Sequence, residues 1–167
     1  MDTSKFIIRE IQPGDKESLQ EGLAQMTNES RRLRFFYSRK NFTEKELKFL
    51  TEVDQHNHIA FVCISNENSP AGSIRCVRNF DRPEFAELAV TIVDKYQGQG
   101  LGYRLLDTLA DAAIKENITH LYGDFHTSNT NMLKLLEKYC LRHNITMDSL
   151  SLNHTSDGFL YFEMPLR

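Results

Sequence analysis

The stretch Gln97-Gly98-Gln99-Gly100-Leu101-Gly102 decides how this chain is interpreted. It follows residues 88–93, an apolar run typical of a strand, and it opens a segment whose leucines recur at helical spacing. Such a turn favours a phosphate group, because free backbone N–H groups and the positive end of the helix dipole meet there. Glycines also let a ligand approach the backbone closely. The pattern therefore predicts a phosphorylated cofactor at this turn.

The composition is that of an ordinary soluble protein. The 167 residues carry a formal net charge of −3, and 40% of them are hydrophobic. This length predicts one domain, residues 1–167, with a single core. Neither the charge nor the hydropathy favours nucleic acid or a membrane as a partner, since no run approaches the roughly 20 apolar residues of a membrane span.

The chain has three cysteines, Cys63, Cys76 and Cys140, which form neither a metal-binding spacing nor a disulfide framework. Cys63 and Cys76 lie in apolar runs and are predicted to be small core residues. His56 and His58 have no cysteine or carboxylate partner at ligand spacing, so no metal is predicted. Free thiols favour a reducing, cytoplasmic compartment.

Apolar periodicity and turn residues predict twelve elements along the chain. Strands are expected over residues 6–11, 59–65, 73–78, 85–93, 120–125, 146–151 and 159–166, and helices over 16–27, 30–36, 101–117 and 132–143. A further helix begins after a capping box formed by Thr43 and Glu46. Hairpins mixed with crossovers predict an α/β domain with a mostly antiparallel sheet and one parallel crossover around the glycine turn.

This order of elements and its glycine turn resemble the GNAT superfamily of acyl-CoA-dependent N-acyltransferases. The superfamily signature is Arg or Gln, two residues, Gly, one residue, then Gly or Ala, and Gln97, Gly100 and Gly102 match it. A Rossmann fingerprint needs two residues between its last two glycines, where this chain has one, and a P-loop needs Gly-Lys-Ser/Thr. The resemblance implies a seven-stranded mixed sheet flanked by helices, with splayed fourth and fifth strands. It also implies acetyl-CoA as co-substrate.

A narrower resemblance is to the catalytic domain of bacterial Pat-type protein lysine acetyltransferases. It rests on residues 30–36, 42–47 and 50–54, and on residues 86–89, which match the fourth strand of that family. The implied acceptor is a protein lysine, with a small-molecule amine as the alternative. Those proteins usually carry a large acyl-CoA-synthetase-like domain or a cyclic-nucleotide-binding domain. The 167 residues match only the catalytic part, so a stand-alone catalytic domain is expected here. Regulation by another chain and formation of a homodimer are left open.

The resemblance also assigns the cofactor site. The pantetheine arm would lie between the splayed strands and pair with backbone groups near Ile92 and Val93. The pyrophosphate would bind the glycine turn, and Asn129 would contact the arm while also serving as an N-cap, with Asn131 as an alternative. The predicted cofactor residues are Ile92, Val93, Gln97, Gly98, Gln99, Gly100, Leu101, Gly102, Tyr103, Arg104 and Asn129.

Glu87 is the predicted general base, because it interrupts an apolar strand and matches the catalytic glutamate of Pat-like domains. A lysine acceptor has a pKa near 10.4 and must lose a proton before it attacks. An outward-facing glutamate in an ion pair is the structural alternative. A catalytically silent acyl-CoA-binding module is the rival function, since Leu136 replaces the tyrosine that many relatives use as a general acid.

Three further features are expected to be structural. Tyr139 is assigned to the core, and His126 to a hydrogen-bonded loop at the end of a strand. In the basic and aromatic run over residues 31–40, Leu33, Phe35 and Phe36 are expected to pack inward and the arginines to face solvent. Those arginines would attract an acidic protein substrate or the 3′-phosphate of the cofactor.

Overall fold

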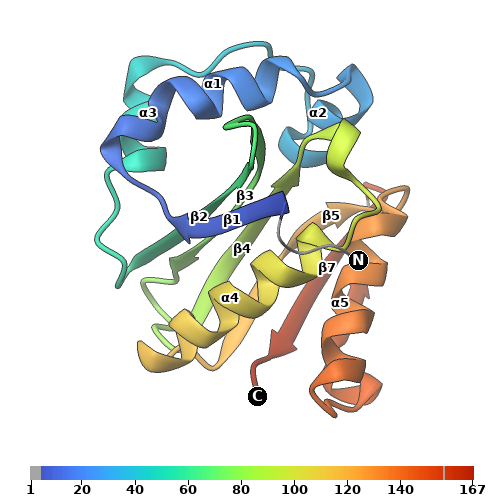
Figure 1. Cartoon of the computed structure of the whole chain (residues 1–167). Helices are drawn as coiled ribbons and strands as arrows, with labels where there is room; N and C mark the ends of the chain where they lie inside the picture. The colour runs from blue at the N-terminus through green and yellow to red at the C-terminus, as the bar shows by residue number, and fades with distance from the viewer. Residues whose placement is uncertain (1–4, 156) are drawn as a thin grey trace.

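The computed structural model describes residues 5–155 and 157–167 (Figure 1). Seven strands form one sheet in the order β1-β2-β3-β4-β5-β7-β6. The strands are β1 Phe6–Glu10, β2 His58–Ser65, β3 Pro70–Arg78, β4 Phe85–Ile92, β5 His120–His126, β6 Ser151–His154 and β7 Phe159–Pro165. The pair β4–β5 is parallel and the other neighbours are antiparallel. The predicted mostly antiparallel sheet with one parallel crossover is confirmed.

Helices cover both faces of the sheet (Figure 1). They are α1 Lys16–Ala24, α2 Asn28–Phe35, α3 Glu44–Thr51, α4 Leu101–Lys115 and α5 Thr130–Arg142. The larger core cluster lies where α4 and α5 pack on the sheet, and it includes Leu105, Leu109 and Leu136. A smaller cluster around Ile11, Ala60 and Val62 lies on the side of α1. The leucine stripe predicted for α4 therefore faces the core.

Local sequence signals explain most helix boundaries. Thr43 accepts a hydrogen bond from the backbone of Glu46, and Glu46 accepts one from the backbone of Thr43, so the predicted capping box at α3 is confirmed. The helix predicted over residues 16–27 ends at Ala24, because Thr27 acts as the N-cap of α2 and accepts from the backbone of Ser30. Both predicted helices are present, but the first ends three residues earlier and the second begins two residues earlier than the pattern indicated.

The strand predicted over residues 146–151 is a correction. Residues Met147–Ser149 form a short 3-10 turn, and the strand is Ser151–His154. All four side chains of β6 are exposed, because this strand lies at the edge of the sheet beyond β7. An exposed strand shows no apolar alternation by which it can be recognised in the sequence. The buried apolar residue of this segment is Leu150, which precedes β6, so the strand was predicted too early.

The three cysteines are core residues. Cys63, Cys76 and Cys140 are free and fully buried, so the core role predicted for the first two is confirmed. Burial raises the pKa of the Cys76 thiol to about 12. Within the described residues, no helix is both long and apolar enough to cross a membrane.

Candidate active site

A cavity of about 410 Å³ opens where α2, β4, the glycine turn and α5 meet. One wall is β4 from Glu87 onward, and the turn after Tyr96 forms another. Helix α2 contributes Arg34, and the loop before α5 contributes Asn129. The cavity therefore connects the predicted cofactor turn with the predicted general base.

Strands β4 and β5 separate along this cavity. Their pairing begins with Phe85 opposite His120 and stops at Glu87 opposite Tyr122, although both strands continue further. Backbone groups of Phe85 and Val93 bond toward β3, so strand alternation turns those of the even residues 88 to 92 toward the gap. Unpaired strand groups of this kind can accept an extended ligand as an added strand. The gap has the chemistry to accept the two amides of a pantetheine arm.

The glycine turn adopts the backbone conformation that its sequence suggests. Gly98 and Gly100 have φ values of 74° and 80°, in the left-handed region where glycine is strongly favoured. Gly100 is the N-cap of α4 and has no side chain, so N–H groups of the first helical turn remain free to bind an anion. The side-chain amide of Gln97 donates to the carbonyl of Ile92 at 3.1 Å and holds the turn against the end of β4.

Most of the predicted cofactor residues line the cavity. They are Ile92, Gln97, Gly98, Gly100, Leu101, Gly102, Tyr103 and Asn129. Val93 lies outside the lining: its N–H donates to Ala71, and its carbonyl accepts from Tyr96. Among the described residues, Gln99 and Arg104 also lie outside the lining, and the amide of Gln99 bonds back to the preceding turn.

Helix α5 and the residue before it contribute two predicted asparagines and two unpredicted lysines to the cavity lining. The side chain of Asn129 accepts from the backbone N–H of Met132 at 3.1 Å, so its N-cap role is confirmed. Asn131 lines the cavity as well. Lys134 and Lys138 add positive charge to the same wall, and their spacing of four residues on a polar helix face was the available signal.

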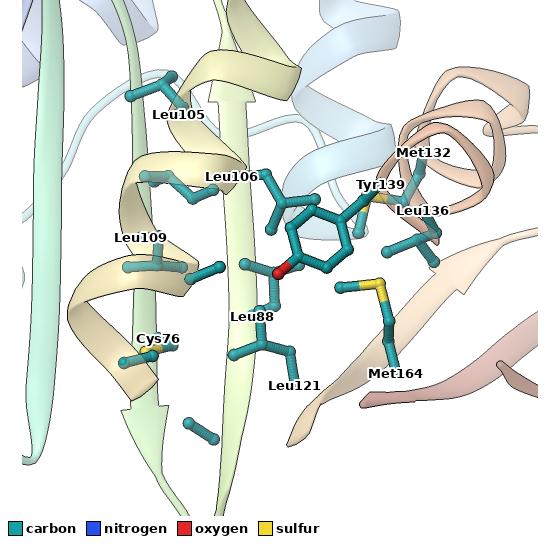
Figure 2. Close-up of a cluster of buried hydrophobic side chains, with 14 of the residues drawn as sticks. Cys76, Leu88, Leu105, Leu106, Leu109, Leu121, Met132, Leu136, Tyr139 and Met164 are labelled. Carbon is teal, nitrogen blue, oxygen red and sulfur yellow. The ribbon is translucent and has the colours of Figure 1, made fainter. Parts of the chain in front are cut away.

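Leu136, which stands where many relatives have a tyrosine acid, is part of the core, and so is Tyr139. Leu136 and Tyr139 are both fully buried. Tyr139 points from α5 into the core that it shares with Leu88, Leu106 and Met164 (Figure 2). Burial raises the pKa of its hydroxyl far above the ordinary value. The core assignment of Tyr139 is confirmed, and its hydroxyl is not among the groups that line the cavity.

Glu87 lies on the wall of the cavity near the point where β4 and β5 part. Its side chain is exposed to the solvent in the cleft, whereas its neighbours Ala86 and Leu88 are buried. Strand alternation explains this contrast, because residues 86 and 88 face α4 while residue 87 faces the side of α2. Asp124, also exposed, places a second carboxylate on the lining.

Arg34 contradicts the prediction that the arginines of this run face solvent, whereas Arg32 is exposed as predicted. Arg34 does not face bulk solvent: it lines the cavity, and its Nε donates to the hydroxyl of Thr91 at 3.1 Å. Burial lowers the pKa of Arg34 to about 10, with the charge of Glu87 acting in the opposite direction. Phe36 was expected inside, but it is 55% exposed and has a φ of 66° at the end of α2.

Asp94 fixes α2 against the end of β4. Its carboxylate accepts from the backbone and hydroxyl of Thr27 and from the hydroxyl of Ser30, at 3.1, 2.8 and 2.7 Å. Burial acts to raise the pKa of Asp94, but these hydrogen bonds outweigh it and lower the pKa. Thr27 and Asp94 are 67 positions apart in the sequence, and their hydrogen bond fixes the start of α2, the helix that carries Arg34 to the cavity.

Neither His126 nor His56 lines the cavity. His126 accepts at Nδ1 from the backbone N–H of Ser128 at 3.1 Å, which is the hydrogen-bonded loop histidine that the sequence predicted. His56 lies 2.5 Å from Glu116 on the surface. No group of three or more His, Cys, Asp or Glu side chains able to hold a metal occurs in the described part of the chain.

Comparisons with known proteins agree with this geometry. Residues 23–140 match the Acetyltransferase (GNAT) family. The acetyltransferase Pat of Mycolicibacterium smegmatis is 31% identical over 134 residues, which make up 80% of this chain and 40% of that protein. The chain thus spans less than half the length of this relative.

Two solved structures have the same fold. The GNAT domain of S. lividans PAT superposes with a TM-score of 0.82 at 22% identity, covering 95% of this chain and 89% of that one. The acetyltransferase yncA of Salmonella typhimurium, solved with its cofactor acetyl-CoA, gives 0.74 at 17% identity, covering 98% and 95%.

The chain belongs to the GNAT family of acetyltransferases. Its class is therefore acetyl-CoA-dependent N-acetyltransferase.

Proposed function

We propose that this enzyme acetylates the side-chain amine of a protein lysine, with Glu87 as general base. The observation that carries the proposal is the position of Glu87, whose carboxylate lines the cavity where β4 and β5 part. A carboxylate there faces both an incoming amine and a thioester held between the strands. The likeness to Pat-type catalytic domains supports a lysine as the acceptor.

The proposed reaction is a direct transfer within one ternary complex. Glu87 accepts a proton from the lysine ammonium, directly or through a water. The neutral amine then attacks the thioester carbonyl, and the developing oxyanion accepts hydrogen bonds from β4 backbone N–H groups that β5 leaves unpaired. The C–N bond forms and the C–S bond breaks. The nitrogen then releases its second proton, which reaches the coenzyme A thiolate through solvent, and Glu87 returns the first proton to solvent.

The same proposal assigns the cofactor contacts. Backbone groups of Val90 and Ile92 would pair with the pantetheine amides, as an added strand. The free N–H groups of Leu101, Gly102 and Tyr103 would bind the pyrophosphate at the start of α4. We place the reaction in the cytoplasm, where three free thiols persist.

Thiol release from acetyl-CoA tests the proposal. The purified chain is given a lysine-containing acyl-CoA synthetase protein in one series and a panel of free amines in the other. Faster release with the protein, together with acetyl-lysine found by mass spectrometry, supports the proposed acceptor. Release with free amines alone identifies a small-molecule acetyltransferase, and acetyl-CoA binding without release for any acceptor identifies a silent binding module.

A further inference from the structure

Arg34 has an unusual place among the arginines on the α2 side of the sheet. Arg39 is held by Glu46, whose two oxygens lie 2.6 and 2.7 Å from Nη2. Arg75 donates to the carbonyl of Leu50 at 2.9 Å and contacts His58. These two cations have partners within the fold, so they are not available to a ligand.

Arg34, by contrast, has one hydrogen-bond acceptor among the described residues, the hydroxyl of Thr91 on its Nε. A guanidinium carries five N–H donors in a planar fork, so its Nη groups still have donors to offer. The guanidinium carbon Cζ of Arg34 lies 4.7 Å from the centre of the Phe35 ring, which covers part of the guanidinium. The remaining donors belong to a side chain that lines the cavity.

The charges on this wall are complementary to a ligand that carries both signs. Glu87 and Asp124 are carboxylates on the side that an amine would approach. Arg34 bonds to Thr91, which lies four residues beyond Glu87 on the same face of β4, so the Cα atoms of Glu87 and Thr91 are about 13 Å apart at the usual rise of a strand. The charge of Glu87 still acts on Arg34. An acceptor that meets both residues would place its amine at Glu87 and its anion at the Nη groups of Arg34, on different atoms of the ligand.

We propose that Arg34 binds a carboxylate carried by the acceptor, so that the enzyme prefers an ε-amine with an acidic group nearby. This inference rests on the proposed function, because it concerns the acceptor of the same reaction. The source that fits the spacing is an acidic side chain next to the target lysine in a polypeptide. A free α-amino group fits poorly, since its own carboxylate is attached to the same carbon.

The test compares acceptors that differ by one charge. Short blocked peptides with one central lysine carry either Glu or Gln at a single flanking position. Wild-type enzyme is expected to favour the best Glu peptide over its Gln partner by on the order of ten- to a hundredfold in kcat/KM, the usual range for a charge-assisted hydrogen bond. Free lysine and 1,5-diaminopentane form a second pair, which reveals whether the carboxylate of a free amino acid also serves.

Three variants assign the preference to the residue. Arg34→Gln should abolish the preference while leaving the KM for acetyl-CoA within about twofold, and Arg34→Lys should recover part of it because it keeps the charge. Arg32→Gln, an exposed arginine on the same helix, is the matched control and should behave as wild type. Thermal unfolding of each variant verifies that it is folded.

Two results would overturn the inference. One is an acidic preference that persists in Arg34→Gln, or that wild type lacks. The other is a rise in the KM for acetyl-CoA alone, which would assign Arg34 to a cofactor phosphate. If wild type acetylates no acceptor, the proposed function fails separately. Glutarate stabilisation of wild type but not of Arg34→Gln would then support the carboxylate site, and equal behaviour of both would refute it.

Discussion

His58 is predicted to make this fold sensitive to mild acid. Its side chain is 8% exposed in β2, and its Nε2 lies 3.0 Å from Nη1 of Arg75. Arginine only donates, so Nε2 must accept, and the imidazole is neutral with its proton on Nδ1. Burial and then the charge of Arg75 lower the pKa of His58 to about 4, with Asp54 acting weakly in the other direction.

The sign and size of the effect follow from proton linkage. Because the folded-state pKa lies below the unfolded value of 6.5, the unfolded chain binds more protons between these limits. The stabilisation is complete above pH 6.5 and disappears as the pH falls toward 4. The full shift corresponds to about 3 kcal/mol, and about 2 kcal/mol of it is lost between pH 7 and pH 5.

Urea unfolding at pH 7, 6 and 5 measures this loss. His58→Gln keeps an acceptor for Arg75 but does not titrate, so wild type should lose about 2 kcal/mol more than this variant over the range. His154→Gln, which changes an exposed histidine on β6, should follow wild type. Carboxylates with lowered pKa values are common to all three proteins and titrate mainly below this window. Equal losses in wild type and His58→Gln would refute the reasoning.

Four further substitutions test the turn, the core and a helix cap. Gly100→Ala should cost about 1–2 kcal/mol, because φ is 80° there, whereas Gly102→Ala should stabilise by up to about 1 kcal/mol, since its new Cβ would lie 3.7 Å from Leu135. Thermal unfolding that shifts in the same direction for both would contradict this. Tyr139→Phe removes a buried hydroxyl without a partner in the described structure, so it should be neutral or stabilising by about 1 kcal/mol in urea and leave the acetylation rate within about twofold; a hundredfold slower reaction would make Tyr139 the general acid. Thr43→Ala should cost about 1 kcal/mol of unfolding free energy by loss of the α3 cap, and an unchanged urea midpoint would show that this cap contributes nothing.

The parts of the fold that could be predicted from sequence depend on short-range patterns. The glycine turn, the leucine stripe of α4 and the capping box at Thr43 each reside within a few residues. Their outcomes follow from local backbone and hydrogen-bonding rules, so the element order and the cofactor turn were available from the chain alone.

The parts that were missed depend on partners distant in sequence. Arg34 points into the cavity because Asp94 fixes the start of α2, a contact that no local pattern reveals. Val93 lies outside the cavity lining because its N–H bonds to Ala71 of β3. β6 was misplaced because its four side chains are exposed and show no apolar alternation. Only its pairing with β7, which is distant from any local pattern, makes it a strand.

The role of Glu87 is the central claim, and Glu87→Gln measures it most directly. The variant should keep the wild-type affinity for acetyl-CoA, while thiol release with the best acceptor should slow by about 10²–10⁴-fold, the usual contribution of a general base. Glu84→Gln, an exposed glutamate in the turn before β4, is the control and should retain full activity. A Glu87→Gln enzyme that turns over within a few fold of wild type would contradict the account.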